Sequence, residues 1–255
     1  MPLPIVEFRD VAKRFGHLVV LDGVTLSIQR GESIVIIGAS GSGKSVMLKH
    51  IVGLLKPESG QVWFDGTRID TLPERQLMKI RQRCGFLFQM GALFDSLTVG
   101  ENIAFPLVEH TRMTPDQIRQ TVAHRLVMVG LPGIENKPPA ELSGGQRKRV
   151  ALARAIALDP EVILYDEPTT GLDPVRSDVI NELIVKLQRE LRTTSIVVTH
   201  DMASAFKIAD RIVMLHEGKL IIDGTPQQIK DSPNPIVRHF VLGEADEKEL
   251  AVLKG

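Results

Sequence analysis

Four short runs of almost uninterrupted apolar residues alternate with helix-like segments in this 255-residue chain. The runs cover residues 33–37, 85–88, 162–165 and 195–198. The helix-like segments include 73–83, 114–130 and 175–191, the last with Val175, Val179, Leu183, Ile184 and Leu187 expected on one buried face. Strands that are apolar on both faces and alternate with helices indicate a parallel sheet covered on both sides. The pattern therefore predicts an α/β fold with a mostly parallel sheet.

The beginning of the chain shows a different pattern. Runs rich in β-branched and aromatic residues occupy 5–8, 24–28 and 61–64. The third run is followed by Asp65-Gly66, a pair that favours a tight turn between strands. We expect this part to be β-structure.

Charge and cysteine content limit the classes of partner and compartment. Lys and Arg number 31, as do Asp and Glu, so the net charge is zero and gives no general attraction to nucleic acid or a membrane surface. Cys84 is the single cysteine, which fits a reducing cytosol. The first residues lack the basic and apolar segments of a signal peptide, and no apolar run is long enough to span a bilayer.

Chemically active residues follow each of the four apolar runs. Gly38 opens a glycine-rich loop after the first run and Gln89 follows the second. Asp166 and Glu167 follow the third, and His200 comes shortly after the fourth. Ligands of open α/β sheets bind beyond the carboxyl ends of the strands. We therefore expect these residues to converge at one edge.

The glycine-rich loop fits the phosphate-loop pattern between a strand and a helix. It consists of Gly38, Ala39, Ser40, Gly41, Ser42, Gly43, Lys44 and Ser45. Its glycines permit backbone conformations that direct N–H groups toward phosphate oxygens. We expect Lys44 to reach the β- and γ-phosphates and Ser45 to bind Mg²⁺.

The other residues at this edge suit Mg²⁺ binding and hydrolysis of a nucleotide phosphate. Asp166 suits a second Mg²⁺ ligand, directly or through water. Glu167 is expected near the γ-phosphate, either as a general base or as the group that polarises the attacking water. Gln89 is expected to position the attacking water or to complete the metal shell, and His200 to hydrogen-bond the γ-phosphate. A single Gln or His at a strand end is commonly structural, so both assignments depend on the whole constellation.

A further helix is predicted after Leu142, with Ser143 as its N-cap. Arg147, Lys148 and Arg149 would fall in its first turns, where the helix dipole disfavours cations. Two explanations stay open: the three cations form a solvated basic face, or an anion lies nearby.

Taken in order, these motifs resemble those of ABC-type ATPases. The shared features are the phosphate loop, Gln89, Leu-Ser-Gly-Gly-Gln at 142–146, Asp166-Glu167, Gly-Leu-Asp at 171–173, and His200. The resemblance covers roughly residues 5–230. It implies a phosphate-loop NTPase core with an antiparallel N-terminal β part, a helical subdomain at about 92–160 within a domain of residues 1–232, and a C-terminal extension at 233–255.

The resemblance also implies a head-to-tail homodimer that holds two ATP molecules. Each ATP would lie between the phosphate loop of one copy and Ser143, Gly144, Gly145 and Gln146 of the other. Asp173 would lie in the loop that crosses between copies. Phe15 matches the family's aromatic residue that stacks on adenine, often Tyr, although a core role for Phe15 is an open alternative.

Segments 91–102, 105–110 and 235–240 are similar to the ATPases of Mla- and Mce-type phospholipid transporters. This similarity implies two partners, an integral membrane permease and an Mce-domain lipid-binding protein. It also implies a peripheral position on the cytoplasmic face of the inner membrane. Whether a small regulatory subunit binds as well is left open. The alternatives are the ATPase of an amino-acid or other polar-solute importer, and a soluble ABC ATPase without a transporter.

Two surfaces are candidates for partner contacts. The segment after Gln89 is expected to face the permease through Leu93, Phe94, Leu97 and Phe105, although core packing of the helical subdomain is the stronger expectation for Leu97 and Phe105. In the tail, Asn234 and Pro235 favour a short helix with Ile236, Val237, Phe240 and Val241 on one face, followed by the acidic residues Glu244, Asp246, Glu247 and Glu249 and the apolar residues Leu250, Val252 and Leu253. That helix either packs on its own domain or docks on a partner.

Overall fold

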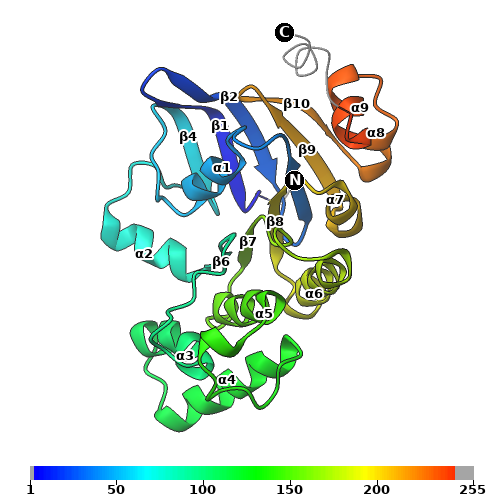
Figure 1. The fold of residues 1–255 in the computed structure, drawn as a ribbon. Helices are drawn as coiled ribbons and strands as arrows, with labels where there is room; N and C mark the ends of the chain where they lie inside the picture. The colour runs from blue at the N-terminus through cyan, green and yellow to red at the C-terminus, as the bar shows by residue number, and fades with distance from the viewer. Residues whose placement is uncertain (1–2, 245–255) are drawn as a thin grey trace.

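The computed structural model describes residues 3–244, and within them a six-stranded sheet forms the centre of the molecule (Figure 1). Its order is β10-β9-β3-β8-β7-β6. The bounds are β3 (Ser33–Ile37), β6 (Cys84–Leu87), β7 (Val162–Asp166), β8 (Thr194–Thr199), β9 (Arg211–His216) and β10 (Lys219–Gly224). Neighbouring strands run parallel except for β10, which is antiparallel to β9. The four predicted core strands are confirmed.

A second, antiparallel sheet contains the first strands of the chain. Its order is β2-β1-β4-β5. The bounds are β1 (Val6–Phe15), β2 (Leu18–Ile28), β4 (Ser59–Phe64) and β5 (Thr67–Arg68). Asp65 and Gly66 form the turn between β4 and β5, both with positive φ, as the sequence predicts. The predicted fold class is confirmed in both parts.

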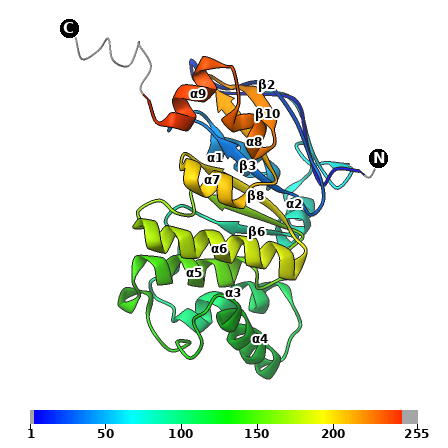
Figure 2. The same cartoon turned by 90° about the vertical axis from the view of Figure 1, so that its right-hand side faces the viewer.

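Helices cover the sheets and extend away from them at one end (Figures 1 and 2). They are α1 (Lys44–Ile51), α2 (Glu74–Gln82), α3 (Val99–His110), α4 (Pro115–Met128), α5 (Gly144–Ala155), α6 (Pro174–Leu191), α7 (Met202–Ile208), α8 (Pro226–Lys230) and α9 (Pro235–Leu242). Helices α3 and α4 lie together at the end farthest from the antiparallel sheet, and α5 lies between them and the central sheet. Within 3–244, no helix is long and apolar enough to cross a bilayer.

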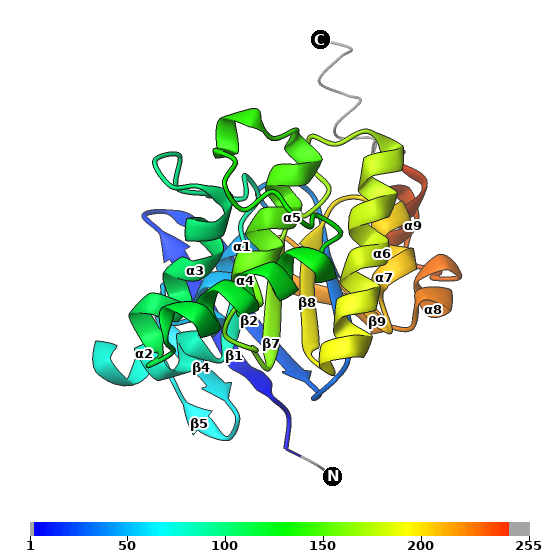
Figure 3. The same ribbon diagram turned by 90° about the horizontal axis from the view of Figure 1, so that it is seen from below.

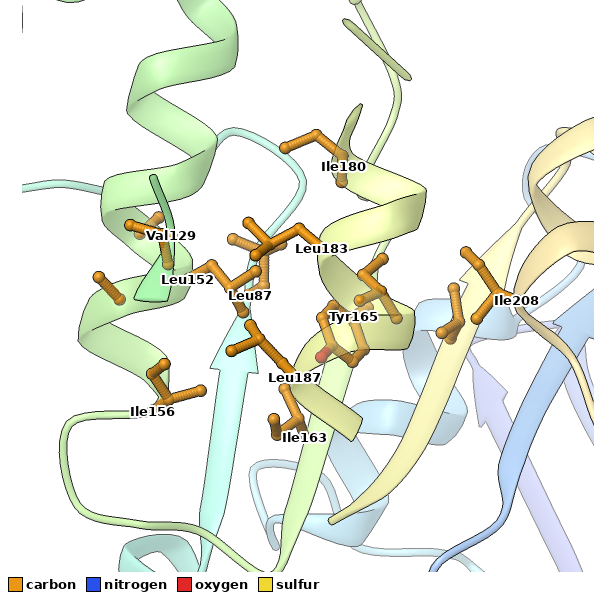
Figure 4. Packing of buried hydrophobic residues seen from close by; sticks show 14 of the residues in the cluster. Leu87, Val129, Leu152, Ile156, Ile163, Tyr165, Ile180, Leu183, Leu187 and Ile208 are labelled. Atoms are coloured by element: carbon orange, nitrogen blue, oxygen red, sulfur yellow. The ribbon is translucent and has the colours of Figure 1, made fainter. Parts of the chain in front are cut away.

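Alternation along the parallel strands divides the interior into two cores. In β3, Val35 and Ile37 face one core, whereas Ile34 and Ile36 face the other. Helices α5, α6 and α7 cover the first core, and its side chains interlock around Tyr165 (Figures 3 and 4). The antiparallel sheet and α1 cover the second. Burial on both sides explains why these strands are apolar at nearly every position.

Capping boxes mark the starts of α3, α4 and α5, the helices around the predicted helical subdomain. Thr98 and Glu101 form a capping box at α3, Thr114 and Gln117 form one at α4, and Ser143 begins α5 in the same way. Each cap satisfies backbone N–H groups that would otherwise lack partners at the first turn. The predicted cap Ser143 is confirmed, and the predicted helix that starts at 114 begins with a cap at Thr114.

The predicted buried face of α6 is partly wrong. Val175 is 75% exposed and Val179 is 48% exposed, whereas Ile180 is buried. The buried stripe of α6 runs through Ile180, Leu183, Ile184 and Leu187 at helical spacing. The two valines lie on the flank of this stripe because each residue turns about 100° around the helix.

The tail helix α9 packs on its own domain. Asn234 caps it through the N–H of Ile236, as predicted. Val237 is buried in the core under α7 and α8, and Phe240 packs against the same core. Ile236, expected on the buried face, is 41% exposed. The expectations for Asp246, Glu247, Glu249, Leu250, Val252 and Leu253 lie outside the described residues.

A ring of charged residues joins the two sheets at the edge away from the phosphate loop. Arg30 and Arg83 each contact both Asp65 and Glu161; Arg83 lies 2.5 Å from each carboxylate. Hydrogen bonds from Arg83 and then Arg30 lower the pKa of Asp65. The ring ties the β4–β5 turn to the starts of β6 and β7.

We expect Asp65→Asn to lower the free energy of unfolding by about 1 kcal/mol or less at neutral pH, since the ring is partly exposed. Because the pKa of Asp65 is lower in the folded protein, its contribution is complete above the ordinary pKa of about 4 and is lost as the pH falls below it. Urea unfolding at several pH values measures this. A difference that persists unchanged in acid would contradict the ion-pair role.

Candidate nucleotide-binding site

The glycine-rich loop connects β3 to α1 in a conformation that requires glycine at two positions. Gly43 has a φ of 104°, and a Cβ there would lie 2.7 Å from Cγ1 and 2.9 Å from the carbonyl oxygen of Val20. A Cβ on Gly38 would lie 2.3 Å from the carbonyl oxygen of Leu215. The loop therefore lies directly against β2 and β9. At these two positions only glycine fits, because it has no side chain.

The loop forms one wall of a hollow of about 350 Å³. The hollow is lined by Phe15, Val20, Ser40, Gly41, Gly43, Lys44, Ser45, Val46, Gln89, Glu167 and His200. Residues from separate parts of the chain therefore meet at the predicted edge. Within the loop, the hydroxyl of Ser42 is buried without a hydrogen-bond partner among residues 3–244 and does not line the hollow.

Lys44 is a buried cation at the bottom of this hollow. Its Nζ donates to the carbonyl oxygens of Gly38 at 2.8 Å and Ala39 at 3.0 Å, and lies 3.7 Å from Oε1 of Glu167. Burial lowers the pKa of Lys44, and the charge of Glu167 opposes that shift. An anionic phosphate at this point would compensate the buried charge.

Ser45 lines the hollow and is in direct contact with Asp166, which does not itself line it. The hydroxyl of Ser45 donates to Oδ1 of Asp166 at 2.7 Å. Burial raises the pKa of the Asp166 carboxyl, although the Ser45 hydrogen bond opposes this. A hydroxyl and a carboxylate in contact are donor types that Mg²⁺ accepts, so the residues present fit the predicted ion.

Besides its ion pair with Lys44, Glu167 has three side-chain hydrogen-bond partners. His200 Nδ1 lies 3.0 Å from Oε1, and the hydroxyls of Thr170 and Thr199 each donate to Oε2 at 3.3 Å. The carboxylate is thus held at the hollow with a defined orientation. Sequence reasoning missed both threonines, although Thr199 directly precedes the predicted His200 at the end of β8.

Phe15 lines the hollow and is 48% exposed, so the alternative of a core role is wrong. The Nζ of Lys13 lies 5.3 Å from the centre of its ring. An exposed aromatic face beside a phosphate loop is suited to stacking on a nucleotide base.

The remaining predicted residues lie outside this hollow. Ser143, Gly145 and Gln146 line a separate depression between α5 and α6. Gly144 lines a third hollow that Gln89 and Leu172 share. Asp173 caps α6 through the N–H of Arg176 at 2.9 Å. Within one chain, therefore, the structure does not bring the Leu-Ser-Gly-Gly-Gln motif to the phosphate loop.

The three basic residues after this motif do not form a solvated basic face, and they do not gather around one anion. Lys148 is buried and donates to the carbonyl oxygens of Glu167 and Thr170, whereas Arg149 donates to those of Val129 and Gly130. Arg147 is exposed. Carbonyl oxygens of neighbouring loops, rather than solvent or an anion, therefore accept hydrogen bonds from two of the three cations.

Comparison with known proteins places this site in a family. The family described as ABC transporter matches residues 21–170. The chain is 43% identical to a probable ribonucleotide transport ATP-binding protein of Mycobacterium leprae, over 95% of this chain and 70% of the relative. It is also 43% identical to the intermembrane phospholipid transport system ATP-binding protein MlaF of Haemophilus influenzae, over 95% and 92%.

A plant relative is similar to a comparable degree. The chain is 41% identical to the chloroplastic protein TRIGALACTOSYLDIACYLGLYCEROL 3 of Arabidopsis thaliana, over 95% of this chain and 74% of the relative. The chain belongs to the ABC transporter family and is one of its ATPases.

Solved structures confirm the fold. A dimeric ATP-binding cassette in a post-hydrolysis state, bound to ADP and Pi, superimposes with a TM-score of 0.80 at 38% identity, over 87% of this chain and 98% of that one. The protein cbiO1 from Clostridium perfringens, part of the ABC transporter complex cbiONQ, superimposes with a TM-score of 0.84 at 31% identity, over 99% of both chains.

We expect Lys44→Ala and Glu167→Gln to separate binding from hydrolysis. Lys44→Ala removes a charged donor and should weaken ATP binding about 10- to 100-fold. Glu167→Gln keeps the shape of the side chain and should bind ATP normally but lose about 10²–10⁴ in turnover, as for a positioned base. Calorimetry and phosphate release measure the two effects, with Lys79→Ala on the exposed face of α2 as control. Near-normal turnover of Glu167→Gln would contradict its role.

Proposed function

We propose that this chain is the ATP-hydrolysing subunit of a transporter that moves phospholipids. The observation that carries the ATPase part is the Glu167 carboxylate, which is held by three side chains in the hollow that also contains Lys44. The relatives named for phospholipid transport support the substrate class.

Different residues in and beside the hollow bind ATP and hydrolyse it. The loop from Gly38 to Ser45 binds the phosphates, and Phe15 stacks on the adenine. Ser45 and Asp166, with Gln89, would hold Mg²⁺, whose charge offsets that of the phosphates. Glu167 accepts the proton of the attacking water, and His200 hydrogen-bonds the γ-phosphate and orients Glu167.

A second copy of the chain completes each site. The first turn of α5 presents the exposed Ser143 and Gly144 away from the chain's own phosphate loop. A helix N-terminus with small residues suits a phosphate group, which the loop of another copy would carry. Asp173 would lie at the crossing between the copies. The dimeric ATP-binding cassette bound to ADP and Pi supports this arrangement.

An apolar groove of about 420 Å³ next to Gln89 is the proposed docking site of the permease. It is lined by residues from α2, β6, α3 and α5. Phe94 and Phe105 lie 5.0 Å apart in it, and Arg154 lies 5.6 Å from the Phe94 ring. Phe105, expected in the core, is 43% exposed, because α3 turns it toward this groove; Leu97 is half-buried.

The proposal also covers the domain boundaries of the chain, its location in the cell and its further partners. It includes a division into an ATPase domain at 1–232, with its helical subdomain at about 92–160, and an extension at 233–255. It also includes a peripheral position at the cytoplasmic face of the inner membrane, an Mce-domain partner and, as an open possibility, a small regulatory subunit. The relatives named for intermembrane phospholipid transport support the membrane association.

Transport of a polar solute is the second candidate, because the mycobacterial relatives carry the name of ribonucleotide transport. Affinity purification from detergent-solubilised membranes separates the two. Recovery of a permease with an Mce-domain protein supports phospholipid transport. Recovery of a permease with a soluble solute-binding protein supports the second candidate.

We expect Ser143→Arg to abolish hydrolysis while each monomer still binds ATP, because the bulky cation closes the partner's half of the site. In a mixed dimer, a Ser143→Arg chain and a Lys44→Ala chain place both lesions in one site and leave the other intact. Mixing these two inactive variants should therefore restore part of the activity, which phosphate release measures. A mixture that stays inactive although mixed dimers form would contradict the shared site.

We expect Phe94→Ala to reduce recovery of the permease complex and lipid transport, and to spare the ATPase activity of the isolated subunit. The reason is that Phe94 lines the groove but not the nucleotide hollow. Val108→Ala, which changes an exposed apolar residue of α3 outside that groove, is the control. Equal loss of assembly and isolated ATPase activity would indicate a folding defect instead.

A further inference from the structure

Lys148 is a buried cation that the proposed function leaves unused. It lies in the second turn of α5 and is 7% exposed. Its Nζ donates to the main-chain oxygens of Glu167 at 3.3 Å and Thr170 at 2.8 Å. Burial lowers its pKa to about 8, against the effect of the Glu167 charge. A lysine is costly to bury, so the two oxygens it holds indicate what it does there.

The first oxygen belongs to a residue with an unfavourable backbone conformation. Glu167 has a φ of 49°, in the left-handed region that residues with a side chain disfavour. Its N–H donates to the carbonyl oxygen of Val198 in β8 at 3.0 Å. Its carbonyl oxygen accepts from Lys148. The sheet and α5 thus hold the residue from both sides, and its carboxylate points to His200 and Lys44.

The second oxygen belongs to a residue that holds the same carboxylate. Thr170 donates its hydroxyl to Oε2 of Glu167 at 3.3 Å. One ammonium therefore fixes both the backbone of Glu167 and the backbone of a hydroxyl that orients its side chain. Thr170 also begins the short segment that leads to Asp173 at the start of α6.

We propose that Lys148 is a positioning residue for ATP hydrolysis, which holds Glu167 in the conformation that aims its carboxylate at the nucleotide. The proposal rests on the function proposed above. In the proposed dimer, the start of α5 meets the ATP of the other copy while Glu167 faces its own. Lys148 therefore connects the two ATP sites through one chain.

The test compares Lys148→Met, which keeps the length but has no donor, with Lys148→Arg, which keeps the donors. Lys148→Met should lower kcat about 10- to 100-fold, the effect of one charged hydrogen bond, with little change in KM or in ATP binding. Lys148→Arg should recover part of kcat. Lys186→Met is the matched control, since Lys186 also donates to a main-chain oxygen, that of Met128, and does not line the hollow.

A double-mutant cycle with Glu167→Gln distinguishes positioning from a general structural role. If Lys148 acts through Glu167, Lys148→Met should change the residual rate of Glu167→Gln less than about threefold. An equal fold-loss in both backgrounds, or an unchanged kcat in Lys148→Met alone, would overturn the proposal. If Lys148→Met does not fold, Lys148→Leu, which also lacks a donor, takes its place in the same cycle. A failure of the proposed function appears separately, as normal turnover in Glu167→Gln by itself.

Discussion

Hydrogen bonding between parallel strands fixes the relative positions of the residues at the nucleotide site. Ile37 of β3 is paired with Thr199 of β8, and Asp166 of β7 is paired with Val198 of β8. The next residues along each strand therefore emerge side by side, and these are the phosphate loop, His200 and Glu167. Because backbone groups set this register, the site remains in place only while both cores keep the sheet intact.

Helix α5 links this edge to the rest of the molecule. Near its start, Lys148 contacts the backbone of Glu167. Near its end, Arg154 donates to the carbonyl oxygen of Gly91, just after Gln89, and lies over the ring of Phe94 in the apolar groove. In the account proposed here, one rigid helix thus contacts the segment that docks the permease, the residue that activates water, and the ATP of the other copy.

The sequence predicted the parts of this structure that depend on local chemistry and periodicity. Strands buried on both faces, the capped start at Ser143, and the convergence of Gln89, Glu167 and His200 all follow from residue type and order. The buried contacts of Lys148 could not be predicted, because its acceptors are main-chain oxygens about 20 residues away. Val175, Val179 and Phe105 were misplaced because apolar periodicity alone does not reveal which side of a helix the core covers.

In the proposed dimer, a single chain carries only half of each ATP site. The phosphate loop and Glu167 share one hollow, whereas Ser143 and Gln146 line another. The most direct measurement is the ATPase rate per chain of the isolated subunit as its concentration is lowered. In the proposed dimer, two copies must meet before hydrolysis, so this specific activity should fall steeply on dilution. A specific activity that stays constant down to concentrations at which sedimentation shows only monomers would contradict it.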